Sequence, residues 1–263
     1  MTSNSYSSFA RRSAGLLLAA VTAAAISMPA AAADDGRSGW FGSSSRVTGS
    51  GKVASETRAV TGFQAVSLRS SMKLVLRQGT REGIELRGDD NLLALVETQV
   101  VDRGGVPTLE LAFKRGTSIS TRTPIVATID LVTLRALSIS GSGDIVGDAL
   151  KTPGLAVAIS GSGNVKLTQL TADEVSAKVS GSGDIAFSGR TTKLGVSISG
   201  SGDVDTHALE AEDVSVSVAG SGDADVIARK TLTVSIAGVG SVKYRGDATV
   251  KTSIAGHGSV TKQ

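Results

Sequence analysis

Four aspartates on two neighbouring repeats of the chain are the residues best suited to bind a metal ion. Asp203 and Asp205 flank one apolar residue, and Asp223 and Asp225 flank another, twenty positions later. Alternate residues of a strand face the same side, so each pair of carboxylates is expected to point outward. Carboxylates held close together repel each other, and Ca²⁺ relieves that repulsion because it takes six to eight oxygen ligands. These four aspartates form the candidate Ca²⁺ site, and no other cofactor is expected.

The same aspartates also have a simpler interpretation, in which they are hydrated and accept hydrogen bonds from the backbone of their own turns. Asp and Asn commonly do this in turns. Calcium-binding β-rolls carry Gly-Gly-x-Gly-x-Asp twice per coil, whereas this chain carries its motif once per repeat. We favour the simpler interpretation and keep a Ca²⁺-binding repeat protein as an alternative.

Residue types that usually carry catalysis are scarce. The chain has no Cys, and its two histidines, His207 and His257, stand fifty positions apart. No Gly-x-Ser-x-Gly nucleophile elbow with triad partners is evident in the sequence. Glycoside hydrolysis needs two carboxylates roughly 5 to 10 Å apart. Any row of aspartates contains pairs at this distance, so the spacing is weak evidence for catalysis. The prediction is a protein that is not an enzyme, and a carbohydrate-active β-helical enzyme is the alternative.

Internal repetition explains the 32 glycines of this 263-residue chain. A Gly-Ser-Gly-Asp type of tetrapeptide recurs seven times at intervals of 18 to 20 residues, the last two copies being degenerate. Sharp turns favour glycine because many of them require a positive φ. The expected structural turn residues are Gly141, Gly143, Gly161, Gly163, Gly181, Gly183, Gly200, Gly202, Gly220, Gly222, Gly238, Gly240, Gly256 and Gly258.

The residues between these turns alternate as strands do. The second residue before each first glycine is Ile or Val, as in Ile139 and Ile159, and its neighbours are chiefly Ser and Ala. Period two with β-branched residues on one side predicts short strands with one buried face. A repeat of this length suits one coil of a single-stranded parallel β-helix. A β-sandwich with glycine turns is the alternative, although it would seldom keep one register seven times.

Four segments are expected along the chain. Residues 1–33 are predicted to be a signal peptide, because Arg11 and Arg12 precede a short apolar run. Cleavage is expected after Ala33, and Sec export is favoured over twin-arginine export. Residues 34–57 are rich in Gly and Ser and predict a flexible N-terminus. Residues 58–131 predict a β-rich part that forms first coils or a cap and includes a short helical turn at residues 89–92. Residues 132–263 predict the β-helix with its seven turns.

Charge excludes one class of partner. Removing residues 1–33 deletes two of the 27 basic residues and none of the 24 acidic ones, so the mature net charge is 25 minus 24, or +1. Nucleic acid binding needs a clustered basic face with stacking aromatics, so no nucleic acid partner is expected. The apolar run of the signal peptide is too short to cross a membrane, and no integral membrane segment is expected after cleavage.

Several motifs together resemble a known family. Ser-Gly-Ser-Gly-Asp repeats follow a Phe63-Gln64-Ala65-Val66 stretch, the Asp89-Asp90-Asn91 turn and a Gly105-Val106-Pro107-Thr108-Leu109 stretch. This combination resembles the auto-transporter adhesin head GIN domain family, over about residues 60–262. The resemblance implies a right-handed β-helix and a cell-envelope location, and it brings no catalytic residue. A large translocator barrel of the kind an auto-transporter carries is not expected from this sequence.

The predicted function is that of a secreted β-solenoid, a structural or adhesin-like binding module of a bacterial envelope. It is expected in the periplasm, on the cell surface or outside the cell. Its partner is expected to be an envelope component, a glycan or a protein, and the sequence leaves open whether the solenoid ends self-associate.

Overall fold

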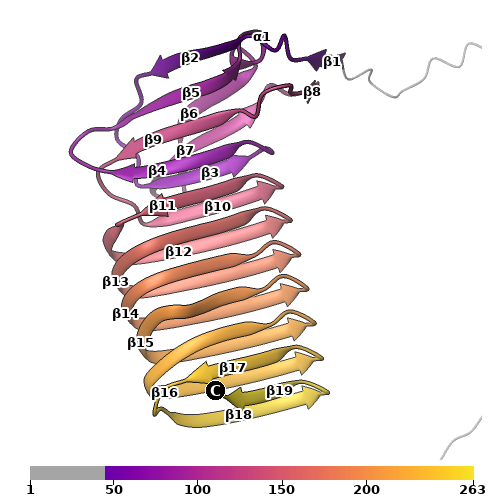
Figure 1. Cartoon of the computed structure of the whole chain (residues 1–263). Helices are drawn as coiled ribbons and strands as arrows, with labels where there is room; N and C mark the ends of the chain where they lie inside the picture. Colours follow the sequence, from indigo (N-terminus) through magenta and orange to yellow (C-terminus); the bar gives the residue numbers. More distant parts are fainter. Residues whose placement is uncertain (1–44) are drawn as a thin grey trace, which may run out of the picture. The chain divides into compact units, whose positions relative to one another are not determined.

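The computed structural model describes residues 45–263, which lie within the compact unit Gly42–Gln263. Most of its strands join one hydrogen-bonded sheet that coils around a common core (Figure 1), while β1 and β8 pair separately. The prediction of an all-β solenoid is confirmed, and its right-handed sense stays a prediction. In chain order the elements are β1 (Ser45–Thr48), β2 (Val53–Arg58), β3 (Ala65–Arg69), β4 (Lys73–Gln78), β5 (Gly83–Asp89), α1 (Asp90–Leu93), β6 (Val96–Arg103), β7 (Val106–Phe113), β8 (Thr117–Ser120), β9 (Val126–Leu131), β10 (Ala136–Gly141), β11 (Asp144–Asp148), β12 (Lys151–Gly161), β13 (Asn164–Gly181), β14 (Ile185–Gly200), β15 (Val204–Gly220), β16 (Ala224–Gly238), β17 (Ser241–Arg245), β18 (Thr249–Gly256) and β19 (Ser259–Lys262).

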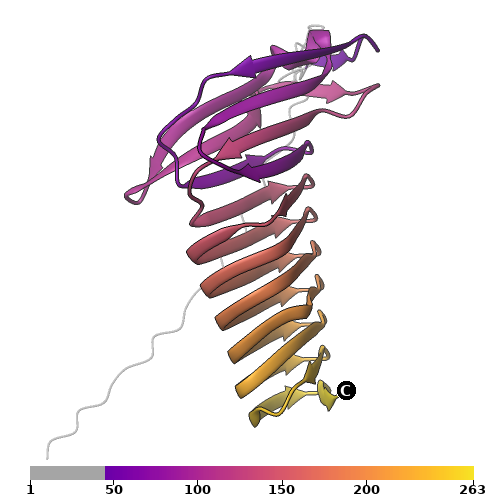
Figure 2. The same ribbon diagram turned by 60° about the vertical axis from the view of Figure 1, so that its left-hand side comes forward.

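From β10 onward each coil lies on the one before it, with equivalent residues in register (Figure 2). Ile139 pairs with Ile159, and Ile159 pairs with Val179, in parallel strands. The first face of the solenoid consists of β9, β4, β11, the first residues of β13–β16, β17 and β19. The second face consists of β7, β3, β10, the last residues of β12–β16, and β18.

The two glycines of each turn are required for different reasons. The first glycine has a positive φ, as at Gly200 with 142°, where a side chain is strained. The second glycine, such as Gly202, has no positive φ, but it is buried against the turn of the preceding coil. A Cβ on Gly202 would lie 2.8 Å from Cγ1 of Val179 and closer still to the carbonyl oxygen of Gly183. Close stacking of the turns therefore excludes side chains from the second position.

The core is a narrow column of aliphatic side chains between the faces. Inward residues of the repeats are almost fully buried, with Val179 at 0% and Ile198 at 1% exposure. Phe63 and Phe187 are buried aromatics in this column. A column one or two side chains wide has little room for rings, which accounts for an aromatic content of 3%.

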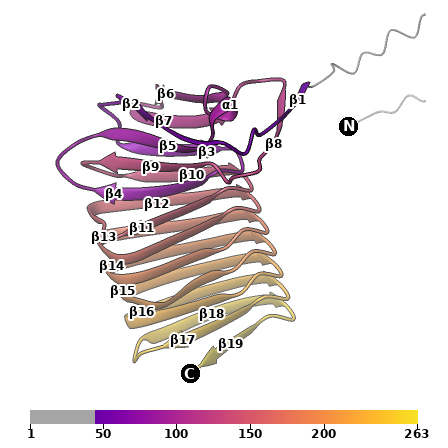
Figure 3. The ribbon, with the colours of Figure 1, turned by 45° about the horizontal axis from the view of Figure 1, so that its top comes forward.

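Residues 65–131 form further coils that are stacked out of chain order. Strands β3 and β4 lie directly on β10 and β11 in parallel, and β7 and β9 lie in turn on β3 and β4. The chain thus makes the coil of β3 and β4 first, passes beyond it through β7 and β9, and returns to begin β10 on its other side. Figure 3 shows these strands above the repeats. The predicted β-rich N-terminal part is present in this form.

Antiparallel strands finish the stack at this end. Strand β6 pairs with β7, β5 pairs with β9, and β2 pairs with β5, all in antiparallel orientation. The predicted helical turn is present as α1, which buries Leu92 and Leu93 in the core. A sheet edge finished in this way presents reversed strands in place of a coil that another parallel strand could extend.

Part of the segment predicted to be flexible is ordered. Residues 45–48 and 53–57 lie in β1 and β2, while residues 34–44 and the predicted signal peptide lie outside the described residues. Hydrogen bonds across the chain hold this segment. Asn91 accepts one from the N–H of Ser50 at 2.9 Å and donates one to the carbonyl of Thr48 at 2.9 Å. Glycine- and serine-rich sequence has no local preference for strands, so this order comes from long-range contacts.

Asp89 is the central acceptor of the same region and is fully buried. Its carboxylate accepts hydrogen bonds from the backbone N–H groups of Gly51 at 3.1 Å, Arg122 at 2.9 Å and Thr123 at 3.2 Å. Burial alone would raise the pKa of Asp89, but these backbone donors outweigh it and the pKa is lowered. The carboxylate ties β5 to two connecting segments that are far away in sequence.

Candidate functional site

The aspartates that follow the glycine turns form a ladder along the first face. The ladder consists of Asp144, Asn164, Asp184, Asp203, Asp223 and Ser241. Asn164, Asp184, Asp203 and Asp223 each accept a hydrogen bond from a backbone N–H of the next coil, and Asp144 accepts one from the side-chain amide of Asn164. Oδ1 of Asp203 accepts the N–H of Asp223 at 2.8 Å, and Oδ1 of Asp223 accepts the N–H of Ser241 at 2.7 Å. The ladder therefore links successive coils, which corrects the expectation that these side chains serve their own turns.

The other two candidate calcium ligands have different partners. Asp205 accepts hydrogen bonds from Nδ1 and from the backbone N–H of His207, the latter at 3.1 Å. Asp225 lies 3.6 Å from the guanidinium of Arg245, and its Oδ1 is buried without a hydrogen-bond partner. Val204 and Ala224 between the acids point into the core, as the alternation predicts.

These contacts do not assemble the four aspartates into one ligand set. Within residues 45–263 no group of three or more His, Asp or Glu side chains is arranged to hold a metal ion. Asp203 and Asp223 each use one oxygen in the ladder, while Asp205 turns toward His207. The calcium site stays a hypothesis, and the geometry gives it no support.

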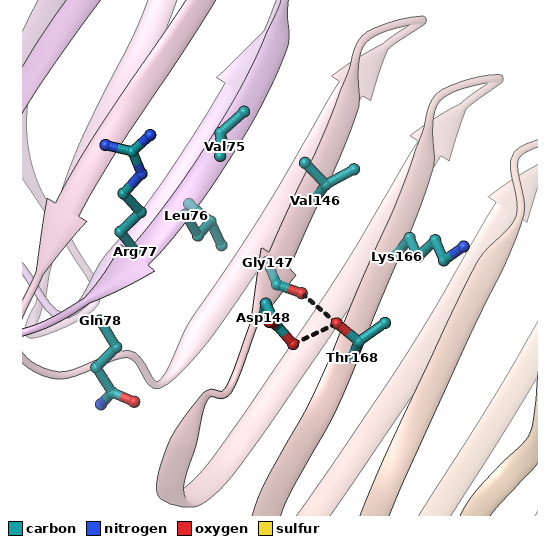
Figure 4. Close-up of a pocket in the computed structure, with 9 residues that line it drawn as sticks. All are labelled: Val75, Leu76, Arg77, Gln78, Val146, Gly147, Asp148, Lys166 and Thr168. Atoms are coloured by element: carbon teal, nitrogen blue, oxygen red, sulfur yellow. Dashed lines mark hydrogen bonds between the residues drawn. The ribbon is translucent and has the colours of Figure 1, made fainter.

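A groove made of two parts lies on the first face. Its larger part has a volume of about 520 Å³ and is lined by β4, β11 and β13 (Figure 4). Its smaller part, of about 150 Å³, is lined by β13, β14 and β15. Lys166 and Thr168 line both parts, so the two parts lie next to each other across five neighbouring strands. At about 4.8 Å per strand, the groove is about 19 Å long.

Two parallel rows of side chains line this groove. The first row runs in register through Val75, Val146, Lys166, Ala186 and Asp205, so it is apolar on β4, β11 and β14 and charged on β13 and β15. Val75, Val146 and Ala186 are half-buried, which is unusual for outward positions of an alternating strand.

The second, polar row contains hydrogen-bonding groups from each coil. Arg77 pairs in register with Asp148, and Asp148 pairs with Thr168. Thr168 donates a hydrogen bond of 2.6 Å from its hydroxyl to Asp148 (Figure 4). His207 lines the far end of the groove. Donors and acceptors thus alternate along this row, and the basic and acidic lining residues balance.

A second polar cavity, of about 410 Å³, lies where the chain bends between the two faces. Its charged residues pair between coils: Arg229 lies 2.9 Å from Glu210, and Lys230 lies 2.6 Å from Glu212. The hydrogen bond from Lys230 to Glu212 and the charge of that carboxylate raise the pKa of Lys230. Because opposite charges already face each other here, this cavity is explained by contacts that join the coils.

The structure brings only one predicted site residue, Asp205, into the groove. Asp203, Asp223 and Asp225 do not line it. The groove itself was missed from sequence, although adjacent apolar residues gave a signal. In Ile145-Val146 one of the two must face outward, and Leu74-Val75-Leu76 places a second apolar side chain on the same side.

Several solved structures share this architecture. A "putative adhesin" from Bacteroides fragilis is 26% identical with a TM-score of 0.76, over 82% of this chain and 100% of that one. A "putative adhesin" from Parabacteroides distasonis is 25% identical with a TM-score of 0.65, over 83% and 100%. A "putative lipid binding protein" from the same organism is 23% identical with a TM-score of 0.67, over 83% and 100%, and shows the fold alone.

No curated protein is significantly similar to the chain. In residues 45–263 no helix is long and apolar enough to cross a membrane. The family pattern described as "Putative auto-transporter adhesin, head GIN domain" matches residues 62–248, which include β3–β17 and all but the last of the glycine turns. The chain belongs to this family.

Proposed function

We propose that this protein is an exported, non-enzymatic binding module of a bacterial cell envelope, and that its groove holds an extended neutral glycan. The groove across β4, β11, β13, β14 and β15, whose two adjacent parts share Lys166 and Thr168, is the observation that carries the proposal. Membership of an adhesin family and the signal-peptide pattern of residues 1–33 support export and binding.

The two sides of the groove match the two kinds of surface on a sugar chain. The C–H faces of a sugar fit an apolar strip such as Val75 and Val146, and its hydroxyls fit alternating donors and acceptors such as Thr168 and Asp148. The lining contains Arg77 and Lys166 against Asp148 and Asp205, so the charges balance and a polyanion gains nothing there. A lipid chain would need an enclosed apolar cavity, whereas this groove is open and carries charges.

The groove lining carries no stacking aromatic, because Phe187 is buried at 3% exposure. Binding at one groove is therefore expected to be weak, about 0.1 to 1 mM, and to depend on several sites acting together on a surface. Weak individual binding by many copies is a usual property of adhesion.

The test is binding of residues 34–263 to neutral oligosaccharides of about four to six sugars, followed by NMR titration or calorimetry. Ala186→Arg fills the smaller part of the groove, in the path of a ligand that spans all five strands, and Ser217→Arg on the exposed second face is the matched control. The proposal expects loss of binding for Ala186→Arg alone. Equal binding by both variants would refute the groove, and new reducing ends after incubation would establish the glycan-cleaving alternative.

A further inference from the structure

The last coil leaves the C-terminal end of the solenoid core uncovered. Within residues 45–263, β18 pairs only with β16 and β19 only with β17, so both have a free edge. The register places Val250, Thr252 and Ile254 on the core side of β18. Ile254 is 44% exposed, whereas Ile236, which is its partner in the preceding coil, is 1% exposed. An apolar core end with free strand edges is a surface that attracts another strand.

The opposite end shows how this fold covers such an edge. There, antiparallel β6 and β5 cover the parallel strands β7 and β9, and α1 buries Leu92 and Leu93 over the core. The N-terminal end of a second copy offers no parallel strand to continue the coil, because antiparallel β2 and β6 form its outer edges. The two C-terminal ends carry exposed core residues of the same kind in the same register.

We propose that two copies cover each other's C-terminal ends, with their β18 strands paired antiparallel about a two-fold axis at Thr252. Two-fold symmetry makes identical strands antiparallel. Centred on Thr252, the pairing places Val250 opposite Ile254 of the second copy and Lys251 opposite Ser253. Apolar core residues then meet each other, the two threonines meet at the axis, and no like charges stand directly opposite.

The size of this surface sets the strength of the dimer. Eight residues of β18 span about 26 Å, and with a core about 10 to 15 Å thick the end presents about 300 to 400 Å². Stable interfaces bury about 800 Å² per partner, so the dimer is expected to dissociate at tens of micromolar. Lys251 places a positive charge at each end, whereas Lys262 is paired with Asp247 at 3.2 Å. Added salt should therefore strengthen the dimer, whereas it would weaken binding of an acidic partner to the same end.

Sedimentation equilibrium of residues 34–263 from about 1 to 300 µM is the first test. The expected result is a monomer–dimer equilibrium in which Ile254→Lys weakens dimerisation at least tenfold. Val239→Lys is the control, because Val239 is 57% exposed at the turn of the preceding coil. Circular dichroism establishes that both variants are folded. A monomer at every concentration, or a dimer that Ile254→Lys leaves unchanged, would overturn the proposal.

A cross-linking test works even if Ile254→Lys does not fold. The chain has no Cys, so a single introduced thiol is the only one present. Directly opposite residues of antiparallel strands lie within disulfide distance, so Thr252→Cys should give a covalent dimer on mild oxidation. Val239→Cys should cross-link at least tenfold more slowly. Equal rates for the two variants would also overturn the proposal.

Discussion

Replacing one buried turn glycine by alanine tests whether stacking, and not backbone conformation, determines the second position of each turn. Gly202 has no positive φ, so alanine is compatible with its backbone. Its added Cβ would nevertheless lie 3.1 Å from the backbone carbon of Gly183 and 2.8 Å from Val179, with the carbonyl oxygen of Gly183 closer still. Overpacking typically costs 1 to 3 kcal/mol. The backbone of Gly183 cannot rotate away as a side chain can. We therefore expect Gly202→Ala to lower the free energy of unfolding by about 3 kcal/mol.

Gly195→Ala is the matched control within the same strand-to-turn segment. Gly195 also has no positive φ, but it faces outward, and the nearest atom to an added Cβ is the carbonyl oxygen of Val175 at 4.0 Å. This variant should stay within about 0.5 kcal/mol of the parent. One kcal/mol corresponds to about 2 to 4 °C in a chain of this size, so Gly202→Ala should lower Tm by about 6 to 12 °C. Equal melting temperatures for the two variants would refute the stacking argument.

Four further results are expected. Because the pKa of Asp89 is lowered, its stabilising contribution is present above the unfolded Asp pKa of about 3.9 and is lost as the pH falls below it, so urea midpoints of Asp89→Asn should show a smaller acid-induced loss than the parent. Asp203→Ala should destabilise by about 1 kcal/mol by leaving the N–H of Asp223 without its acceptor, while Asp203→Asn should be nearly neutral, because Asn164 already fills the same role in the ladder. Calorimetry with Ca²⁺ should give no heat and no change in Tm; a clear rise in Tm would restore the calcium site. N-terminal sequencing of the exported protein should show cleavage after Ala33, and an uncleaved N-terminus would contradict the signal peptide.

The repeated part of the fold was predictable because its determinants are local and recur. Two core positions before each glycine and one after it are apolar in nearly every repeat, and a period of two identifies the buried face without knowledge of any contact. Even so, the sequence argument gave positive φ as the reason for the turn glycines and did not distinguish the two positions of a turn. Only the stacked coils show that Gly202 and its equivalents are small because the preceding turn touches them.

The N-terminal coils were predictable in type but not in order. Nothing in residues 65–78 indicates that this segment stacks between β7–β9 and β10–β11, since strand pairing at long range depends on the closure of the whole chain. The order of residues 45–57 likewise depends on acceptors such as Asp89 and Asn91, more than thirty positions away. Local propensity carries no information about either feature.

The location of the groove follows from how a stacked fold divides its constraints. A row of side chains that contacts the next coil must keep the same residue type in every coil, because each member is the partner of the next. The glycine turns and the aspartate ladder are such rows, and their contacts and hydrogen bonds are made within the solenoid. An outward row that joins nothing is free to change from coil to coil. The row from Val75 through Lys166 to Asp205 changes at almost every step, and it is this row that lines the groove. Recognition by a repeat protein of this kind is therefore to be sought where the repeat pattern breaks, and the conspicuous Gly-Ser-Gly-Asp motif reports the architecture.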